Sequence, residues 1–255
     1  MSHTFRMSYY EYARKHYRLR EDAVFIDSHA SSDLGGNMYY IARQILSGRY
    51  GRFKLYISVK DLENLPQNLR LLQRELPSAR IKLVVQESAA KYYALAVSKY
   101  LFTDVQLSMF YVKRPGQVIV QTWHGTPLKK LGYSYVEDVA FTGGQKKSFI
   151  MADYNLFPNE YTMEHMLESY RLSDNLTGTI LLNGYPRNSV FFDRDAARRL
   201  RKQMELVNKR VYAYMPTWRG ALSRSSNAVR EQAAFLKELE RKLAEDQVFY
   251  VKLHR

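Results

Sequence analysis

One short stretch of the chain combines residue types that could move a proton beside a phosphate group. It runs from Gln121 to Leu131, reads QTWHGTPLKKL, and follows the apolar run at residues 118–120. His124 comes just after this predicted strand, which would fix one face of the imidazole and leave the other open to a substrate. An imidazole titrates near neutral pH and suits general acid–base catalysis. The stretch therefore predicts a catalytic base; the alternative is a histidine packed in a loop.

The residues that follow His124 are of the types expected beside an anion. Gly125 lets a backbone approach closely, and Thr126 with Pro127 is typical of the first turn of a helix. Lys129 and the lysine after it add positive charge near that predicted helix start, where backbone N–H groups already favour anions. The alternative is that the lysines belong to an ordinary solvated surface.

Composition limits the classes of protein to consider. The 255 residues carry 39 Lys plus Arg against 25 Asp plus Glu, a formal charge of +14, so we expect an anionic partner. Nucleic acid, an acidic membrane surface and a phosphate-rich substrate all fit this charge. Cysteine is absent, which excludes disulfides and thiolate metal sites. We find neither a bilayer-spanning apolar run nor a secretory signal, and expect a cytoplasmic protein.

Strand and helix patterns alternate along the first two thirds of the chain. Apolar runs predict strands at residues 24–27, 53–59, 81–85, 100–103, 118–121 and 154–157. Helical periodicity predicts helices at residues 38–46, 61–75, 89–98, 143–151 and 160–170. Such alternation is typical of an α/β fold, with a parallel sheet between two layers of helices. Ligands of these sheets bind at the carboxyl ends of the strands, where we expect His124.

A segment rich in Gly, Pro and Asn interrupts this rhythm at residues 183–188 and predicts a crossover between two halves. Beyond it we expect helices and strands at residues 195–207, 211–215, 227–244 and 248–253. Two parallel strands are too few for a complete doubly wound domain, so the second half is expected to be incomplete. The predicted parts are a leading segment (1–22), a Rossmann-like domain (23–185) and the start of a second domain (186–255).

The leading segment combines basic and aromatic side chains. Its first twenty residues include four tyrosines, and Glu11 is the one acid set against the basic residues Arg6, Arg14, Lys15, Arg18 and Arg20. A helix of this composition suits the headgroup level of an anionic membrane. A solvated helix that packs through its tyrosines is an equal alternative.

Three motifs resemble, in the same order, the signature of the CDP-glycerol glycerophosphotransferase family, which includes teichoic acid polymerases and primases. They are WHGTPLK at residues 123–129, NGYPRN at 183–188 and YMPTWR at 214–219. The resemblance runs from about residue 24 to the C-terminus. It implies a GT-B-like architecture of two Rossmann-type halves. In that family the first half faces the acceptor, the second holds most of the nucleotide, and the active site lies between them.

The resemblance also implies roles for individual residues. His124 matches the essential histidine, and His254 resembles the histidine of a family Lys-x-His-Pro element, with Arg255 in place of the proline. Arginine matches phosphate oxygens in a bidentate fork. We therefore expect substrate-binding roles within the motifs for Trp123, Gly125, Thr126, Lys129, Arg187, Trp218 and Arg219. The tryptophans could instead be core anchors, and Arg187 could brace the interdomain turn.

We expect no metal and no cofactor. Residues 193–195 have the Asp-x-Asp form of metal-dependent sugar-nucleotide transferases, but a helix follows and indicates an N-cap at Asp195. The loop at residues 31–37 matches no phosphate-cradle motif and is interpreted as a plain turn; contact with the acceptor is the alternative. Surface or structural roles are expected for the histidines outside any motif, namely His3, His16, His29 and His165.

The function predicted from these residues and this resemblance is transfer of glycerol phosphate from CDP-glycerol to a hydroxyl group. The acceptor would be a lipid-linked saccharide or a polyol-phosphate chain at the cytoplasmic face of an anionic membrane. His124 would take the hydroxyl proton, while Lys129, Arg219 and His254 would offset charge on the phosphoryl oxygens. One alternative is CDP-ribitol or another activated donor for a capsule-like polymer, and another is a non-catalytic acceptor-binding module. Specific nucleic-acid binding is disfavoured because no recognition motif is present.

Overall fold

The computed structural model describes residues 2–134, 139–215 and 235–252. The chain divides into two compact units, Met1–Ser189 and Val190–Arg255. The site candidates Trp218, Arg219 and His254 lie outside the described residues.

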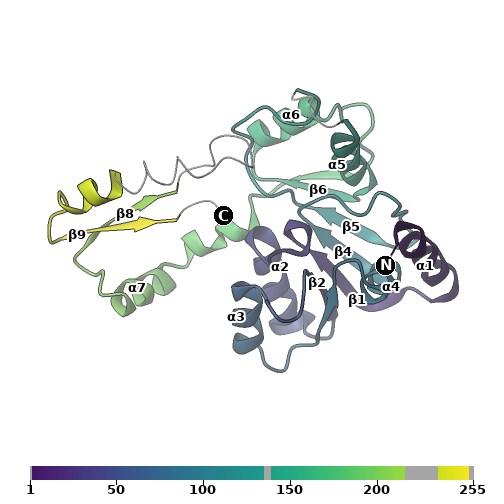
Figure 1. Ribbon diagram of the computed structural model, residues 1–255, viewed down its shortest axis with the longest axis horizontal. Coiled ribbons are helices and arrows are strands. Elements are labelled where there is room, and N and C mark those ends of the chain that lie inside the picture. Colours follow the sequence, from purple (N-terminus) through teal and green to yellow (C-terminus); the bar gives the residue numbers. More distant parts are fainter. Residues whose placement is uncertain (1, 135–138, 216–234, 253–255) are drawn as a thin grey trace. The chain divides into compact units, whose positions relative to one another are not determined.

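The first unit is built on a seven-stranded parallel sheet (Figure 1). Its strands are β1 (Arg20–Asp27), β2 (Lys54–Val59), β3 (Ile81–Val85), β4 (Ser98–Thr103), β5 (Val118–Gln121), β6 (Tyr154–Phe157) and β7 (Thr179–Leu182). Their spatial order is β3-β2-β1-β4-β5-β6-β7. The direction of strand addition therefore reverses between β1 and β4, and ligands of such sheets bind at this reversal.

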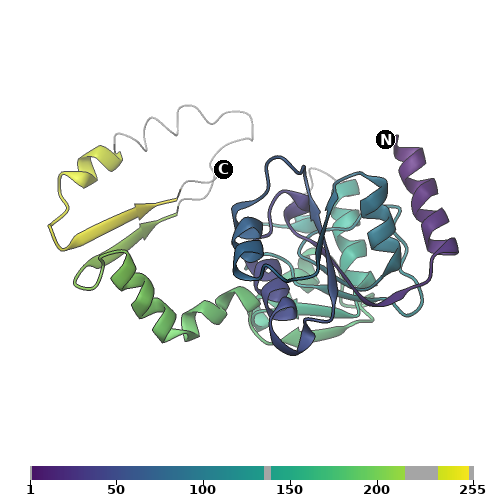
Figure 2. The ribbon, with the colours of Figure 1, turned by 90° about the horizontal axis from the view of Figure 1, so that it is seen from below.

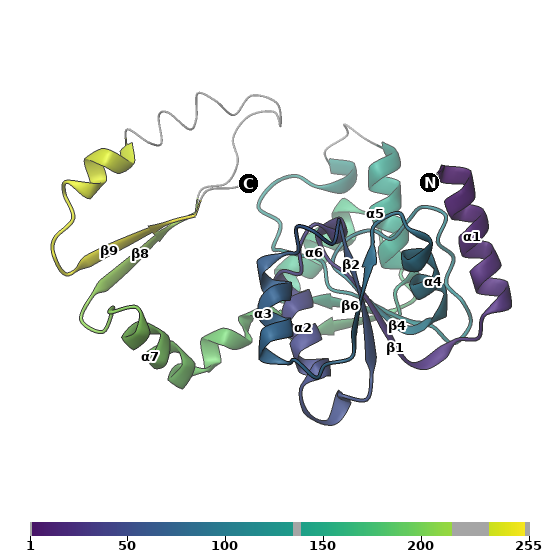
Figure 3. The same cartoon turned by 60° about the horizontal axis from the view of Figure 1, so that its bottom comes forward.

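Helices cover both faces of this sheet. They are α1 (His3–His16), α2 (Gly36–Leu46), α3 (Gln67–Glu75), α4 (Ala89–Val97), α5 (Val139–Met151) and α6 (Glu160–Ser169). Figure 3 shows α2 and α3 on one side of the strands and α1 and α4 on the other. Side chains alternate along β1, so Val24 and Ile26 enter the core under α2 and α3, whereas Phe25 enters the core under α1 and α4. The predicted parallel α/β layering is confirmed.

Helix α3 begins at Gln67, later than the sequence predicts. Pro66 occupies the N-cap position, and a proline disfavours helical dihedrals at the residue before it. Asp61 instead accepts a hydrogen bond at 2.6 Å from the backbone N–H of Asn64, which forms a local turn. The predicted start at residue 61 is therefore wrong.

The second unit contains α7 (Arg194–Gln203) and two parallel strands, β8 (Arg210–Tyr214) and β9 (Gln247–Val251), which lie side by side in Figure 2. The N-cap of α7 is Asp193, whose carboxylate accepts the N–H of Ala196 at 2.8 Å. Asp195, the predicted cap, instead pairs with Arg198 within the helix. Among the described residues, no helix combines the length and the hydropathy needed to cross a bilayer.

Candidate functional site

The candidate site lies where three neighbouring strands end. The last residues of β1, β4 and β5 are register partners, because Asp27 pairs with Thr103 and Thr103 with Gln121. The strands are parallel, so the residues that follow them leave the same edge of the sheet. His29 follows β1 and His124 follows β5. His29 therefore stands at the reversal between β1 and β4, and His124 stands one strand beyond it.

His124 is held with one ring nitrogen engaged. Its Nδ1 lies 2.8 Å from the backbone carbonyl oxygen of Asp104. A carbonyl oxygen only accepts hydrogen bonds, so Nδ1 carries the proton and Nε2 is the nitrogen with the lone pair in the neutral ring. The imidazole stacks on the indole of Trp123 with 4.1 Å between ring centroids. His124 is exposed to solvent. This tautomer suits a base that accepts a proton at Nε2.

Trp123 turns the chain so that His124 leaves the sheet. Its φ is +53°, a left-handed value that costs a bulky residue about 1–2 kcal/mol. The backbone N–H donates to Gln121 Oε1 at 3.0 Å, and the carbonyl oxygen accepts from Asn37 Nδ2 at 3.3 Å. The indole itself is buried in the core. Trp123 thus anchors His124, and a direct contact with substrate remains a prediction.

The segment after His124 is not helical, so the helix predicted from Thr126 and Pro127 is wrong. Tertiary contacts fix this segment instead. The hydroxyl of Thr162, in the first turn of α6, donates to that of Thr126 at 3.4 Å, and Pro127 is buried. Lys129 is exposed on the same segment. An anion site built on a helix start at Pro127 therefore has no structural basis.

Arg187 and Tyr185 join the segment after β7 to the loop that carries His124. Arg187 donates from a guanidinium nitrogen to the carbonyl oxygen of His124 at 3.0 Å, and from its backbone N–H to Asn37 Oδ1 at 3.4 Å. Tyr185 donates to the carbonyl oxygen of Gly125 at 3.4 Å, and burial raises the pKa of this phenol to about 12. Arg187 therefore braces the loop, and its contact with phosphate remains a prediction.

Sequence reasoning missed two members of this site, His29 and Asp104. The ring centroids of His29 and His124 lie 6.2 Å apart. Asp104 is 1% exposed, and its carboxylate accepts the backbone N–H of His29 at 2.9 Å and the hydroxyl of Ser28 at 3.0 Å. Burial raises the pKa of Asp104. Neither residue stands in a motif; the available signal was that each closely follows a predicted strand.

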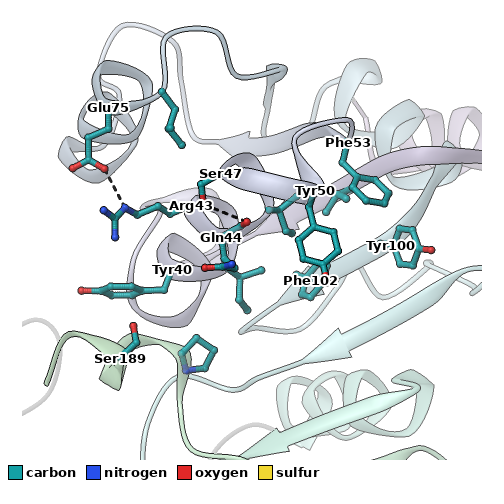
Figure 4. A pocket seen from close by; sticks show the side chains of 15 residues that line it. Tyr40, Arg43, Gln44, Ser47, Tyr50, Phe53, Glu75, Tyr100, Phe102 and Ser189 are labelled. Carbon is teal, nitrogen blue, oxygen red and sulfur yellow. Dashed lines mark hydrogen bonds and ion pairs between the residues drawn. The ribbon is translucent and has the colours of Figure 1, made fainter. Parts of the chain in front are cut away.

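A large, mainly apolar cavity lies beside this site, within the first unit (Figure 4). Its volume is about 950 Å³, and aromatic side chains including Tyr50, Tyr100 and Phe102 line it. Helix α2 links the two places, because Asn37 at its start contacts the His124 loop while Tyr40, one turn later, lines the cavity. His124 is not among the residues that line the cavity.

One family model matches nearly the whole chain. The family model for CDP-Glycerol:Poly(glycerophosphate) glycerophosphotransferase matches residues 8–255. The teichoic acid poly(glycerol phosphate) polymerase of Bacillus spizizenii is 31% identical over 137 residues, 49% of this chain and 34% of that protein. The teichoic acid glycerol-phosphate transferase of Staphylococcus aureus is 26% identical over 188 residues, 68% of this chain and 47% of that protein. The chain thus spans less than half the length of either relative.

A solved structure shares the fold. The wall teichoic acid polymerase TagF superposes with a TM-score of 0.79 and 22% identity, over 98% of this chain and 60% of that chain. At this identity the likeness shows the fold alone. It confirms the GT-B-like α/β architecture expected from the sequence.

Proposed function

We propose, because the chain belongs to the CDP-glycerol:poly(glycerophosphate) glycerophosphotransferase family, that it transfers glycerol phosphate from CDP-glycerol to a hydroxyl group and releases CMP. The observation that carries the proposal is the 2.8 Å distance between Nδ1 of His124 and the carbonyl oxygen of Asp104. The carbonyl oxygen of Asp104 holds a proton on Nδ1, so Nε2 can accept one from the attacking hydroxyl.

His124 would act at the moment of attack. The acceptor oxygen forms a bond to the β-phosphorus of CDP-glycerol, in line with the bond to the bridging oxygen, which breaks. The electron pair of that bond leaves on the phosphate of CMP, and the hydroxyl proton moves to Nε2 of His124. The imidazolium that results still donates from Nδ1 to the carbonyl oxygen of Asp104, whose dipole stabilises the new charge.

Gly125 supports close approach of a substrate. A Cβ built on this glycine would meet nothing within 4 Å, and its φ is not left-handed. The fold therefore does not require glycine at this position, next to the base. Free space over a backbone is what a substrate phosphate can use.

The charge on the phosphoryl oxygens would be offset by basic residues of the motifs. Lys129 and Arg187 belong to the described part of the chain. Arg219 and His254, together with Trp218, are proposed from their motifs alone. Thr126 is exposed on the His124 segment and is proposed to contact substrate there.

Replacement of His124 tests the function. CMP release from CDP-glycerol is measured with a glycerol-phosphate acceptor for wild type, His124→Asn and the control His165→Asn, an exposed histidine on α6. We expect His124→Asn to lose about a hundredfold to ten-thousandfold in rate, as for removal of a general base, and the control to keep full rate. Near-normal turnover by His124→Asn would exclude the role. Turnover measured with CDP-ribitol beside CDP-glycerol identifies the polyol of the donor. If the wild type neither turns over nor binds CDP, a non-catalytic acceptor-binding module is favoured.

The acceptor is proposed to be lipid-linked or a polyol phosphate, with the protein at the cytoplasmic face of an anionic membrane. Helix α1 supports this placement. It packs on α4 through buried Tyr10, and Figure 2 shows it (purple) on the outside of the first unit. Phe5 and Tyr12 are about half exposed, and Lys15 and Arg18 are also exposed. Aromatic and basic side chains together suit an anionic lipid surface.

Charge reversal at Lys15, near the end of α1, and at Arg18, just after the helix, tests this placement. The double variant Lys15→Glu with Arg18→Glu should weaken binding to vesicles with anionic lipid at least about 30-fold, because each basic residue contributes about 1 kcal/mol at such a surface. The control, Lys60→Glu with Lys82→Glu, has the same net charge and changes two exposed lysines elsewhere. Equal loss in both doubles would show that net charge, not α1, determines binding.

A further inference from the structure

Three consecutive residues after β1 have left-handed backbone conformations. The φ values are +47° at His29, +52° at Ala30 and +69° at Ser31. None is glycine, and each such conformation costs an L-residue about 1–2 kcal/mol. Strain of this kind persists only where the surroundings fix it, and it is concentrated at functional sites. The strained turn at residues 29–31 is therefore a candidate part of a functional site.

Buried polar contacts fix the far end of this turn. The hydroxyl of Ser31 lies 3.0 Å from Asp27 Oδ1, 2.7 Å from the hydroxyl of Ser58 and 3.1 Å from Lys91 Nζ. Lys91 Nζ also donates to Asp27 Oδ2 at 2.7 Å. All four side chains are buried. Ser31 thus hydrogen-bonds to the buried ion pair of Lys91 and Asp27 at the carboxyl end of β1.

Asp104 fixes the near end of the turn and sets the place of the His29 ring. The Asp104 carboxylate accepts the backbone N–H of His29, and Oδ2 of Asp104 lies 3.7 Å from Nε2 of His29. Gly35 lies behind the ring, since a Cβ there would come within 3.4 Å of Nε2. The His29 side chain is nevertheless 43% exposed. The imidazole is therefore supported by Asp104 and Gly35 and is otherwise partly open to solvent.

One residue, Asp104, thus orients both imidazoles. Its carbonyl oxygen engages Nδ1 of His124, and its carboxylate faces His29. The ring centroids are 6.2 Å apart, close enough for one oxygen between the rings to meet a nitrogen of each. A ring N–H of His29 can donate to such an oxygen, because an imidazole carries at least one N–H donor.

We propose that His29 is a substrate-binding residue that donates a ring N–H to a phosphate oxygen beside the reacting group at His124. This inference rests on the proposed phosphotransfer reaction. The phosphate belongs either to CDP-glycerol or to the glycerol-phosphate acceptor, and the two sources share the same chemistry.

Steady-state kinetics test the proposal. Asparagine tolerates left-handed φ, so His29→Asn removes the imidazole donor and keeps the turn. We expect it to raise KM by about tenfold, the equivalent of one charge-assisted hydrogen bond, with kcat changed far less. The substrate whose KM rises, CDP-glycerol or the acceptor, identifies the source of the phosphate. His29→Arg, which restores an N–H donor, should recover most of the loss, and the control His165→Asn should behave as wild type.

The outcomes separate this inference from the reaction itself. Normal wild-type turnover with unchanged KM values in His29→Asn would overturn the role of His29 and leave the proposed function standing. Absent wild-type turnover would overturn the function. In that case, NMR titration with glycerol 3-phosphate still decides on His29. Its ring resonance should shift saturably, and His29→Asn should bind at least about fivefold more weakly; equal affinity would overturn the proposal.

Discussion

Breaking the buried ion pair between Lys91 and Asp27 tests whether the turn that carries His29 is held under strain. Lys91 Nζ donates to Asp27 at 2.7 Å and to Ser31 at 3.1 Å, and the paired side chains are 9% and 6% exposed. Lys91→Met keeps the apolar stem, removes both bonds and leaves a buried carboxylate without its cation. Loss of one partner of a buried pair costs about 3–5 kcal/mol. We expect the free energy of unfolding of the first unit to fall by that amount.

Urea unfolding followed by tryptophan fluorescence measures this loss. The chain has two tryptophans, so a Trp218→Phe background leaves Trp123, in the first unit, as the reporter. The matched control is Lys99→Met, because Lys99 pairs with Glu21, whose side chain is 73% exposed. Surface pairs contribute about 1 kcal/mol or less. A loss in Lys91→Met no larger than in Lys99→Met would refute the reasoning.

Three further changes have distinct expected results. Gly178→Ala should lower the free energy of unfolding, measured by thermal melts, by about 1–3 kcal/mol, because its Cβ would lie 2.1 Å from the carbonyl oxygen of Ala152. The control Gly143→Ala, which has open space around its Cβ on α5, should be neutral or stabilising. Asp104→Asn should gain stability relative to wild type as pH rises, measured by urea unfolding at several pH values. Gly125→Ala should fold normally yet lower kcat/KM by about tenfold or more, because a methyl group would fill the space proposed for substrate.

The sign for Asp104 follows from burial, which raises its pKa in the folded protein above the unfolded value of about 3.9. Its contribution to stability is complete below the unfolded pKa and is lost as pH rises through the folded pKa. The asparagine variant has no such loss. A stability difference between Asp104→Asn and wild type that does not change with pH would contradict this expectation. Equal melting temperatures for Gly178→Ala and Gly143→Ala would contradict the expectation for the glycines. Full activity of Gly125→Ala would remove the support drawn from that position.

Local patterns in the sequence were enough to predict most of the sheet. Strands buried on both faces read as continuous apolar runs, and β3, β5 and β6 have the predicted bounds. Strand β7 was missed because it lies at the sheet edge, with Thr179 and Leu182 exposed, and so lacks the pattern of a strand buried on both faces. The predicted helix starting at Thr126 was wrong because contacts with α6 and Tyr185 outweigh the local preference for a helix start.

The candidate site was predictable only in part. His124 stands in a continuous motif, so its place could be inferred from neighbouring residues. His29 and Asp104 meet across 75 positions of sequence, through parallel pairing of β1 with β4. No local pattern records that pairing. Knowing the strand order beforehand would have placed both residues at the reversal point next to β5.

The central claim is that His124 presents an unprotonated Nε2 because the carbonyl oxygen of Asp104 keeps the proton on Nδ1. Nitrogen-15 NMR of protein labelled at histidine reads this tautomer directly at about pH 8.5, well above the ordinary imidazole pKa. The spectrum of His124→Asn identifies the resonances by their loss. We predict a proton on Nδ1 and none on Nε2. A neutral ring with its proton on Nε2 would contradict it.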